Sequence, residues 1–248
     1  MKFTEEQLLV RKIQDKFNKG VVKYGLIKDD DRILVGVSGG KDSLALLEFL
    51  SKRSRIFKPR FTVEGAYIKV KNVPYKSDEE YLREYASALG VALHVYETSF
   101  DESSDTRHSH CFLCSWNRRK VLFRAAKELH CNKIALGHHI DDILQTLLMN
   151  MTFHGSFSTM PPLLKMDKFN MTIIRPFCLV HEKDLQALAD IRGFRKQLEQ
   201  CPYEKESHRA DMKSVLAKLV EMNPEAYYSM WNSLNNVMPN LLPKEVEP

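Results

Sequence analysis

A loop near the start of the sequence has the composition of an anion-binding site. Its residues are Ser38, Gly39, Gly40, Lys41, Asp42 and Ser43, and it joins an apolar run to an amphipathic helical pattern. Glycines let a backbone approach a ligand closely, and the N–H groups at the start of a helix favour negative charge. Lys41 adds a full positive charge, and the serines add hydroxyl donors. The loop therefore predicts a binding site for phosphate groups.

This loop lacks the G-x-x-x-x-G-K-S/T pattern that serves γ-phosphate transfer in kinases and GTPases. It resembles instead the PP-loop of ATP pyrophosphatases, which cleave ATP between the α and β phosphates. The resemblance implies that residues 38–43 bind ATP and its pyrophosphate, with Lys41 and Asp42 in catalytic roles. The alternative is a plain glycine turn between a strand and a helix, with Lys41 in solvent.

A second polar segment follows another predicted strand and contains Gly137, His138, His139, Asp141 and Asp142. Open α/β sheets bind ligands at the carboxyl ends of their strands, so we expect Gly137, His138 and Asp141 to contact ATP. Either aspartate can hold Mg²⁺ against the phosphates, and Asp142 is the candidate for that role. The alternative is that Asp141 caps the following helix while the histidines pack.

The cysteines indicate metal or redox chemistry. There are five of them, an odd number without a secretion signal, which argues against a disulfide framework: Cys111, Cys114, Cys131, Cys178 and Cys201. Cys111 and Cys114 form a C-x-x-C directly before a predicted basic helix, a spacing that lets two thiolates hold one metal or cluster edge. Cys201 can add a third thiolate, or a histidine such as His108 or His110 can complete a zinc site. We expect Cys131 and Cys178 to be packed as small apolar residues.

Taken together, these motifs resemble those of the tRNA 2-thiocytidine synthetases, PP-loop enzymes that thiolate a cytidine in the tRNA anticodon loop. The resemblance extends over much of the chain. The matching segments are residues 38–43, Cys111 and Cys114 with 118–119, 136–139 with 141–142, 160–162, 174–176 and 236–239. Two positions depart from the family: Gln145 stands where a glutamate is common, and Glu204 replaces the second cysteine of another C-x-x-C that begins at Cys201.

The resemblance implies a complete reaction. ATP with Mg²⁺ adenylates the C2 oxygen of the cytidine, and sulfur then replaces that oxygen with release of AMP and pyrophosphate. A [4Fe-4S] cluster on Cys111, Cys114 and Cys201 takes part, with a cysteine desulfurase or sulfide as sulfur donor. The resemblance also suggests a homodimer. We expect Arg118, Arg119 and Lys120 to contact tRNA phosphates, although solvated surface charge is the alternative for that run.

Two other functions remain open from the sequence. A tRNA lysidine synthetase shares the PP-loop and adenylation, but it uses the amine of lysine as nucleophile and needs no cluster. A non-catalytic tRNA-binding module can instead use the C-x-x-C for structural zinc. Metal analysis of protein purified without oxygen separates the three readings, because iron with sulfide, zinc and no metal are distinct outcomes.

The elements that position these residues alternate between strands and helices. This alternation predicts an α/β fold with a parallel sheet and helices on both faces, of the PP-loop or adenine nucleotide alpha hydrolase-like kind. The predicted strands are 33–37, 61–70, 93–97, 133–136 and 172–174, and the helices that follow the first four are 43–51, 78–89, 117–130 and 141–151. Helices are also expected at 182–192 and 213–237. We divide the chain into an N-terminal helical segment (1–30), a PP-loop ATP-binding domain (31–180) and a C-terminal helical extension (181–248).

The bulk composition is compatible with this interpretation. A formal charge of +5 and a pI near 8.8 permit a polyanionic partner without requiring one. The longest apolar runs are far shorter than the roughly 20 residues that span a bilayer, and the N-terminus does not have the pattern of a signal peptide. We therefore expect a cytoplasmic protein with no membrane segment.

Overall fold

A computed structural model describes residues 3–73, 78–100, 110–166, 169–195 and 209–243. The chain divides into two compact units, Met1–Ile140 with Pro161–Ser207 and Asp141–Met160 with His208–Pro248. The first contains the sheet, and the second is helical. This grouping differs from the predicted domain boundaries at residues 30 and 180. The helices just outside both ends of the predicted PP-loop domain share the core of the sheet. The three-segment division stays a prediction.

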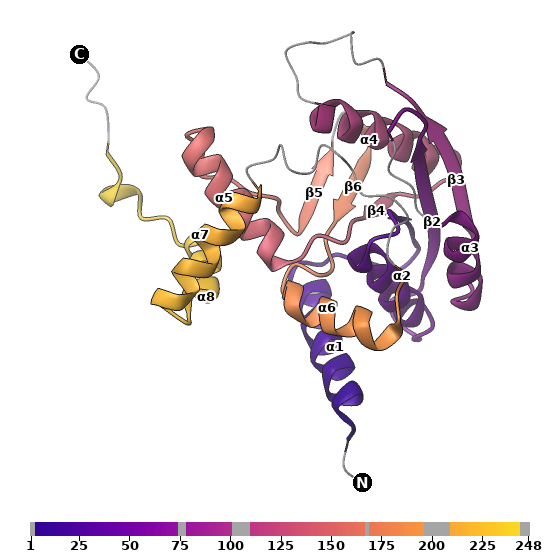
Figure 1. Ribbon diagram of the computed structural model, residues 1–248, viewed down its shortest axis with the longest axis horizontal. Coiled ribbons are helices and arrows are strands. Elements are labelled where there is room, and N and C mark those ends of the chain that lie inside the picture. Colours follow the sequence, from indigo (N-terminus) through magenta and orange to yellow (C-terminus); the bar gives the residue numbers. More distant parts are fainter. Residues whose placement is uncertain (1–2, 74–77, 101–109, 167–168, 196–208, 244–248) are drawn as a thin grey trace. The chain divides into compact units, whose positions relative to one another are not determined.

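The described strands form one six-stranded sheet (Figure 1). In spatial order they are β3 (Leu93–Thr98), β2 (Phe61–Val70), β1 (Asp31–Gly36), β4 (Lys133–Ala135), β6 (Met171–Ile174) and β5 (Leu163–Met166). All pairs are parallel except β5 with β6. The five predicted strands are confirmed, whereas β5, a short antiparallel edge strand, was not predicted. Ile33, Leu34 and Val35 of the central strand are fully buried, as expected for a strand covered on both faces.

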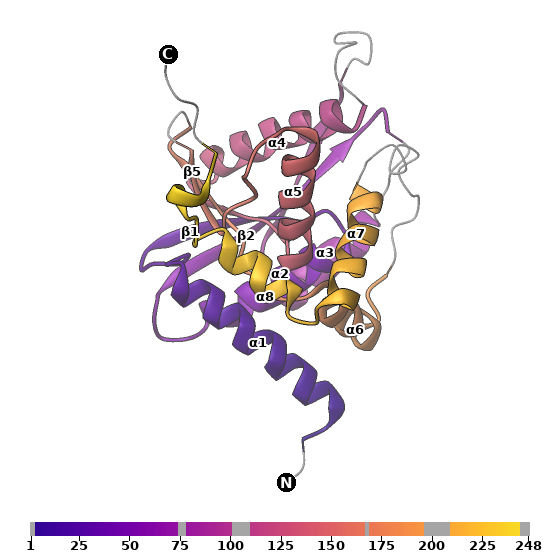
Figure 2. The same ribbon diagram turned by 90° about the vertical axis from the view of Figure 1, so that its left-hand side faces the viewer.

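Helices cover both faces of the sheet, which confirms the predicted fold class. On one face, α1 (Glu5–Lys23), α2 (Lys41–Ser54), α3 (Glu79–Ala88) and α6 (Glu182–Arg192) share a core with Ile33 and Val35. On the other face, α4 (His110–Glu128) packs against Leu34 and Ile134. Figure 1 and Figure 2 both show α4 on the opposite side of the sheet from α1, α2 and α6.

Two predicted helix boundaries were wrong. Helix α4 begins at His110 rather than near residue 117, so Cys111 and Cys114 lie inside its first turns. The helix predicted over 213–237 is two helices, α7 (Arg209–Met222) and α8 (Ala226–Ser233). Pro224 lies between them, and the residue before a proline is driven out of the helical region, which ends α7.

The second unit consists of α5 (Ile140–Phe153) from Asp141 onward, the segment that follows it, and the C-terminal helices α7 and α8. Its own contacts include a hydrogen bond from the Tyr227 hydroxyl to Asp141 and an ion pair between Arg209 and Asp142 at 3.3 Å. Among the described residues of the whole chain, no helix combines the length and apolar character needed to cross a membrane.

The register of the central strands brings two polar loops to the same edge of the sheet. Val35 of β1 lies beside Ala135 of β4, so the loops that leave both strands begin side by side at their carboxyl ends. The amino-terminal ends of these strands are joined by a buried ion pair. In this pair, Lys133 Nζ lies 2.6 Å from Asp31 and 2.7 Å from the carbonyl oxygen of Leu26. This pair joins the starts of the same two strands.

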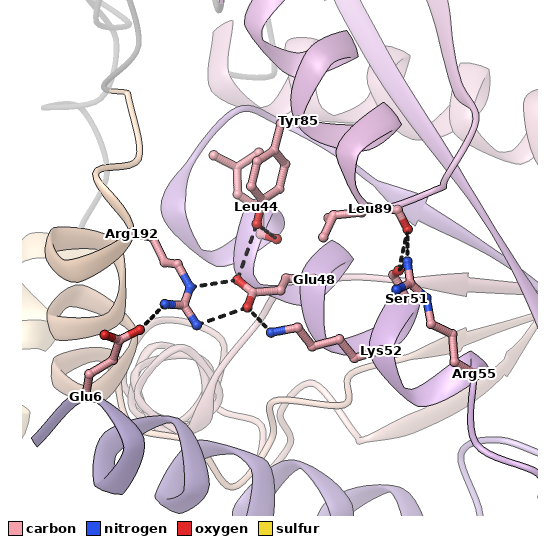
Figure 3. A network of polar contacts seen from close by, with 9 residues as sticks. All are labelled: Glu6, Leu44, Glu48, Ser51, Lys52, Arg55, Tyr85, Leu89 and Arg192. Atoms are coloured by element: carbon pink, nitrogen blue, oxygen red, sulfur yellow. Dashed lines mark hydrogen bonds and ion pairs between the residues drawn. The ribbon is translucent and has the colours of Figure 1, made fainter. Parts of the chain in front are cut away.

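Helix α6 is held against α2 by a network around one buried carboxylate (Figure 3). Glu48 accepts hydrogen bonds from Lys52 and from Arg192 at the end of α6, and Arg192 also pairs with Glu6 of α1. Burial alone would raise the pKa of Glu48, but the hydrogen bonds and charges of Lys52 and Arg192 lower it below the usual value. Glu48 is thus an ionised anchor between three helices.

Candidate active site

The loop from Ser38 to Ser43 is folded back on the first turn of α2. Gly39 has φ of 85°, a conformation that favours glycine, and Gly40 is the N-cap residue of the helix. The Ser43 hydroxyl donates to the carbonyl oxygen of Gly40 at 2.8 Å and accepts from the Ser38 N–H at 3.1 Å. The Ser43 side chain therefore fixes the shape of the loop at the start of α2.

Lys41 lies between two carboxylates at the rim of this loop. Its Nζ is 3.2 Å from Asp42 and 3.7 Å from Glu182, the first residue of α6. Sequence reasoning missed Glu182, because nothing in the sequence brings the start of α6 to residue 41. These ion pairs hold the ammonium group at the start of α2, where a phosphate group would meet it.

Gly137 brings the second predicted segment against this loop. A Cβ atom at position 137 would lie 3.0 Å from the carbonyl carbon and oxygen of Asp42 and 3.2 Å from the Ser43 nitrogen. Only a residue without a side chain fits that approach without a shift of backbone. The two predicted nucleotide-binding segments are therefore in direct contact at Gly137.

His138 is oriented by a buried arginine. Its Nδ1 accepts a hydrogen bond from Arg175 Nε at 3.3 Å, and Arg175 Nη1 also donates to the Pro161 carbonyl oxygen at 2.6 Å. Because the guanidinium only donates, a neutral His138 carries its proton on Nε2. Burial, and then the charge of Arg119, lower the pKa of Arg175 to about 10, so it stays cationic at neutral pH. Arg175 was predicted as part of a family motif but not as a site residue.

A cavity extends from Ser38 of the loop to the C-x-x-C. It measures about 370 Å³, within the usual range for ligand pockets. Its polar wall contains Ser38 and His138 on one side and Cys111, Cys114, Arg118 and Arg119 of α4 on the other, and Ala66, Ile68 and Leu122 supply apolar wall. Ser38 of the loop and two thiols thus line the same space.

The two cavity thiols differ from the two buried ones. Cys131 and Cys178 are buried as predicted, and burial raises the pKa of Cys131 to about 11 and that of Cys178 to about 12, so both stay protonated. Cys111 and Cys114 are only half-buried. His110 lines the cavity beside them, but within the described ranges no three His, Cys, Asp or Glu residues are arranged to hold a metal. The predicted third ligand Cys201 and the alternative His108 lie outside the described residues.

Comparison with known proteins agrees with this geometry. The family described as the PP-loop domain matches residues 7–215. A tRNA-cytidine(32) 2-sulfurtransferase from Syntrophotalea carbinolica is 37% identical over 241 residues, which cover 96% of this chain and 93% of that protein. This chain belongs to the tRNA 2-thiocytidine synthetase family of PP-loop proteins.

Further relatives give the same result for this PP-loop protein. The tRNA-cytidine(32) 2-sulfurtransferase of Geobacter sulfurreducens is 35% identical over 245 residues, covering 96% of this chain and 94% of that one. The solved structure of the U34-tRNA thiolase NcsA from Methanococcus maripaludis with its [4Fe-4S] cluster superposes with a TM-score of 0.73. At 22% identity, with 93% of this chain and 78% of that chain covered, this likeness establishes the fold.

Other predicted site residues lie on α5 and α4. Asp141 and Asp142 begin α5 in the second unit, where Tyr227 and Arg209 are among their partners. The magnesium role of Asp142 stays a prediction. Arg118 and Arg119 line the PP-loop cavity, whereas the Lys120 ammonium lies over the ring of Trp116, 5.7 Å from its centroid. Helix α4 therefore faces the cavity with two of its three predicted RNA-binding cations.

Proposed function

We propose that this protein thiolates a cytidine in the anticodon loop of tRNA, with ATP as the activating substrate. The observation that supports this most strongly is the shared cavity, in which the PP-loop residue Ser38 and the thiols of Cys111 and Cys114 line one space. The relatives act on cytidine 32 by their name, which points to the same position as the target here. Sulfur transfer to an activated base requires both chemistries within reach of one atom, and a cavity lined by Ser38, Cys111 and Cys114 supports this arrangement.

The first step is adenylation of the C2 oxygen of the cytidine, because that oxygen alone is a poor leaving group. The backbone N–H groups of residues 39–43 and the Lys41 ammonium bind the pyrophosphate as it departs, which stabilises the charge that develops there. Asp42 and Glu182 hold Lys41 at the loop rim until the phosphates replace them as partners. Asp142 is the proposed ligand of Mg²⁺, which shares the charge of the phosphates.

His138, in the second polar segment, is a further proposed hydrogen-bond donor to the substrate. Because Arg175 donates to Nδ1, the proton of a neutral His138 lies on Nε2, and this is the atom proposed to donate to a phosphate or a base oxygen. Arg175 itself brings a second positive charge close to the cavity. Together His138 and Arg175 stabilise negative charge on AMP.

Cys111 and Cys114 fit the role of cluster ligands, since they are half-buried, one helical turn apart and on a cavity wall. Cys201 is the proposed third ligand. A [4Fe-4S] cluster with three cysteine ligands supplies, when bound, an open iron that carries the sulfur for transfer. Arg118 and Arg119 lie on the same helix and line the same cavity.

The proposal includes partners and location. Arg118, Arg119 and Lys120 contact tRNA phosphates, a cysteine desulfurase or sulfide supplies the sulfur, and the protein acts as a homodimer in the cytoplasm. Phosphate contacts of this kind position the RNA and carry no sequence information by themselves.

The test uses protein purified without oxygen, ATP, Mg²⁺, sulfide and tRNA, with nucleosides analysed by mass spectrometry and nucleotides by chromatography. The expected products are 2-thiocytidine, AMP and pyrophosphate, together with iron and sulfide on the protein. Lys41→Ala should abolish turnover while the fold is kept, and Lys58→Ala, a mostly exposed lysine away from the loop, should not. Formation of ADP, of lysidine, or a zinc content in place of iron would overturn the proposal.

A further inference from the structure

Helix α4 carries a second face beside its cavity-lining face. Phe112, Trp116 and Lys120 recur at every fourth residue, so at about 100° per residue they form one stripe along the helix, next to Arg119 at the cavity. The rings of Phe112 and Trp116 are nearly parallel, with 6° between their planes and 6.4 Å between centroids. We call these three residues the aromatic stripe.

The stripe faces solvent rather than the sheet. Phe112 is 45% exposed and Trp116 is 46% exposed, whereas Leu113, Val121 and Leu122 of the same helix are buried. Helix α4 therefore packs against the rest of the protein through its buried residues. Two parallel aromatic rings with this exposure leave aromatic surface open to solvent, which favours a binding role over that of an isolated surface residue.

The charge around the stripe selects the kind of partner. Helix α4 carries five cations against one acidic residue, Glu128: Arg118, Arg119, Lys120, Arg124 and Lys127. A ligand that matches both features offers flat π faces and negative charge in alternation, which describes single-stranded nucleic acid. A protein partner would have to bring acidic and aromatic groups in the same spacing.

We propose that the aromatic stripe is a stacking platform for an unpaired base of the tRNA anticodon loop, a neighbour of the base that enters the cavity. This inference rests on the proposed function. Arg119 lies between the stripe and the cavity, so the phosphate that links the two nucleotides passes the arginine pair of Arg118 and Arg119. The platform holds one base while its neighbour reaches the cavity, as unstacking of a target base requires.

The test measures the affinity of cluster-loaded protein, purified without oxygen, for a labelled anticodon stem-loop RNA and for a blunt RNA duplex of equal length. Trp116→Ala should weaken stem-loop binding roughly 5- to 150-fold, the range for loss of one stacked base, and leave duplex binding unchanged. Trp116→Phe, which keeps a ring face, should bind almost as wild type. Trp116→Leu, which keeps apolar bulk without a ring, should be as weak as Trp116→Ala.

Salt dependence separates stacking from charge. Trp116→Ala should leave the slope of log affinity against log salt unchanged, whereas Lys120→Ala should reduce it by about one unit if Lys120 contacts a phosphate. A second readout uses the two tryptophans of the chain. Trp231 is buried, so in a Trp231→Phe background the emission of Trp116 should be quenched by the stem-loop and not by the duplex.

If Trp116→Ala binds the stem-loop as tightly as wild type, the stacking platform is excluded. It is also excluded if Trp116→Ala loses affinity equally for the stem-loop and the duplex. A change in self-association alone, measured by sedimentation, would reassign the stripe to a contact between protein copies. Nucleoside analysis with wild-type protein keeps the two proposals apart. Trp116-dependent stem-loop binding without any 2-thiocytidine would contradict the proposed function and leave the stacking platform supported.

Discussion

The contact at Gly137 gives a quantitative test of how the PP-loop is positioned. In Gly137→Ala the new Cβ would meet the carbonyl carbon and oxygen of Asp42 at 3.0 Å. Non-bonded carbon atoms are most stable at about 3.5–4.0 Å, so the two backbones must separate by roughly 0.5–1 Å. Both neighbours are main-chain atoms, and the Ser43 side chain ties the loop to α2, so no side chain can turn away to make room.

This displacement should cost both stability and activity. Overpacking of this kind destabilises a fold by about 1–3 kcal/mol. A misplacement of about 1 Å in a catalytic array can cost about 100-fold in rate, so we expect kcat/KM for ATP to fall about 10- to 100-fold. Steady-state release of pyrophosphate, measured with saturating tRNA, reports the rate, and thermal melting reports the stability.

Gly25→Ala is the matched control. Gly25 has φ of 59° and nothing within 4 Å of an added Cβ, so alanine there should cost about 1–2 kcal/mol through backbone strain alone. The two variants should therefore melt at similar temperatures, and only Gly137→Ala should lose turnover. Wild-type ATP kinetics in Gly137→Ala would show that the two loops do not need this close contact.

The remaining predictions concern the Glu48 anchor and the third cysteine. Because the folded pKa of Glu48 is lowered, its stabilising effect should be complete above its ordinary pKa of 4.5 and lost as the pH falls through the lower folded value. Glu48→Gln should thus cost about 1.5–3 kcal/mol at pH 7, with a smaller deficit near pH 3, as measured by urea unfolding; a deficit independent of pH would contradict an ionised anchor. Cys201→Ala, purified without oxygen, should carry much less iron and sulfide than wild type and lose thiolation, and a full complement of both would exclude Cys201 as a ligand.

The sheet and the loops at its edge were predictable because their signals are local. A parallel strand buried on both faces is a continuous apolar run, as in Ile33–Leu34–Val35, and the alternation of strand and helix patterns marked five of the six described strands. The phosphate loop follows directly from that pattern, since its glycines and lysine stand between a strand and a helix. Strand β5 lacked a comparable signal, because it is a four-residue antiparallel edge strand with partial burial.

The start of α4 was missed because tertiary packing decides it. Residues 110–116 contain cysteine, serine, histidine and aromatic residues, which have weak intrinsic helix propensity. Leu113 is nevertheless buried in a small cluster with Val70, Val73 and Phe100, and this contact supports the first turns of the helix. Likewise, Glu182 and Arg175 reach the site through the folding of segments more than thirty residues from their partners, which no local pattern reports.

The helical start of α4 also changes how the C-x-x-C should be understood. On a loop, two cysteines could turn toward a metal independently of their surroundings. On a helix, residues three apart point to nearly the same side, so the direction of both thiols is set by the packing of the whole helix. Leu113 lies between Cys111 and Cys114, and its burial against Val70 and Phe100 fixes that direction toward the cavity. Trp116 of the same helix is 46% exposed, so α4 places its two thiols on the cavity wall and an aromatic ring at the surface.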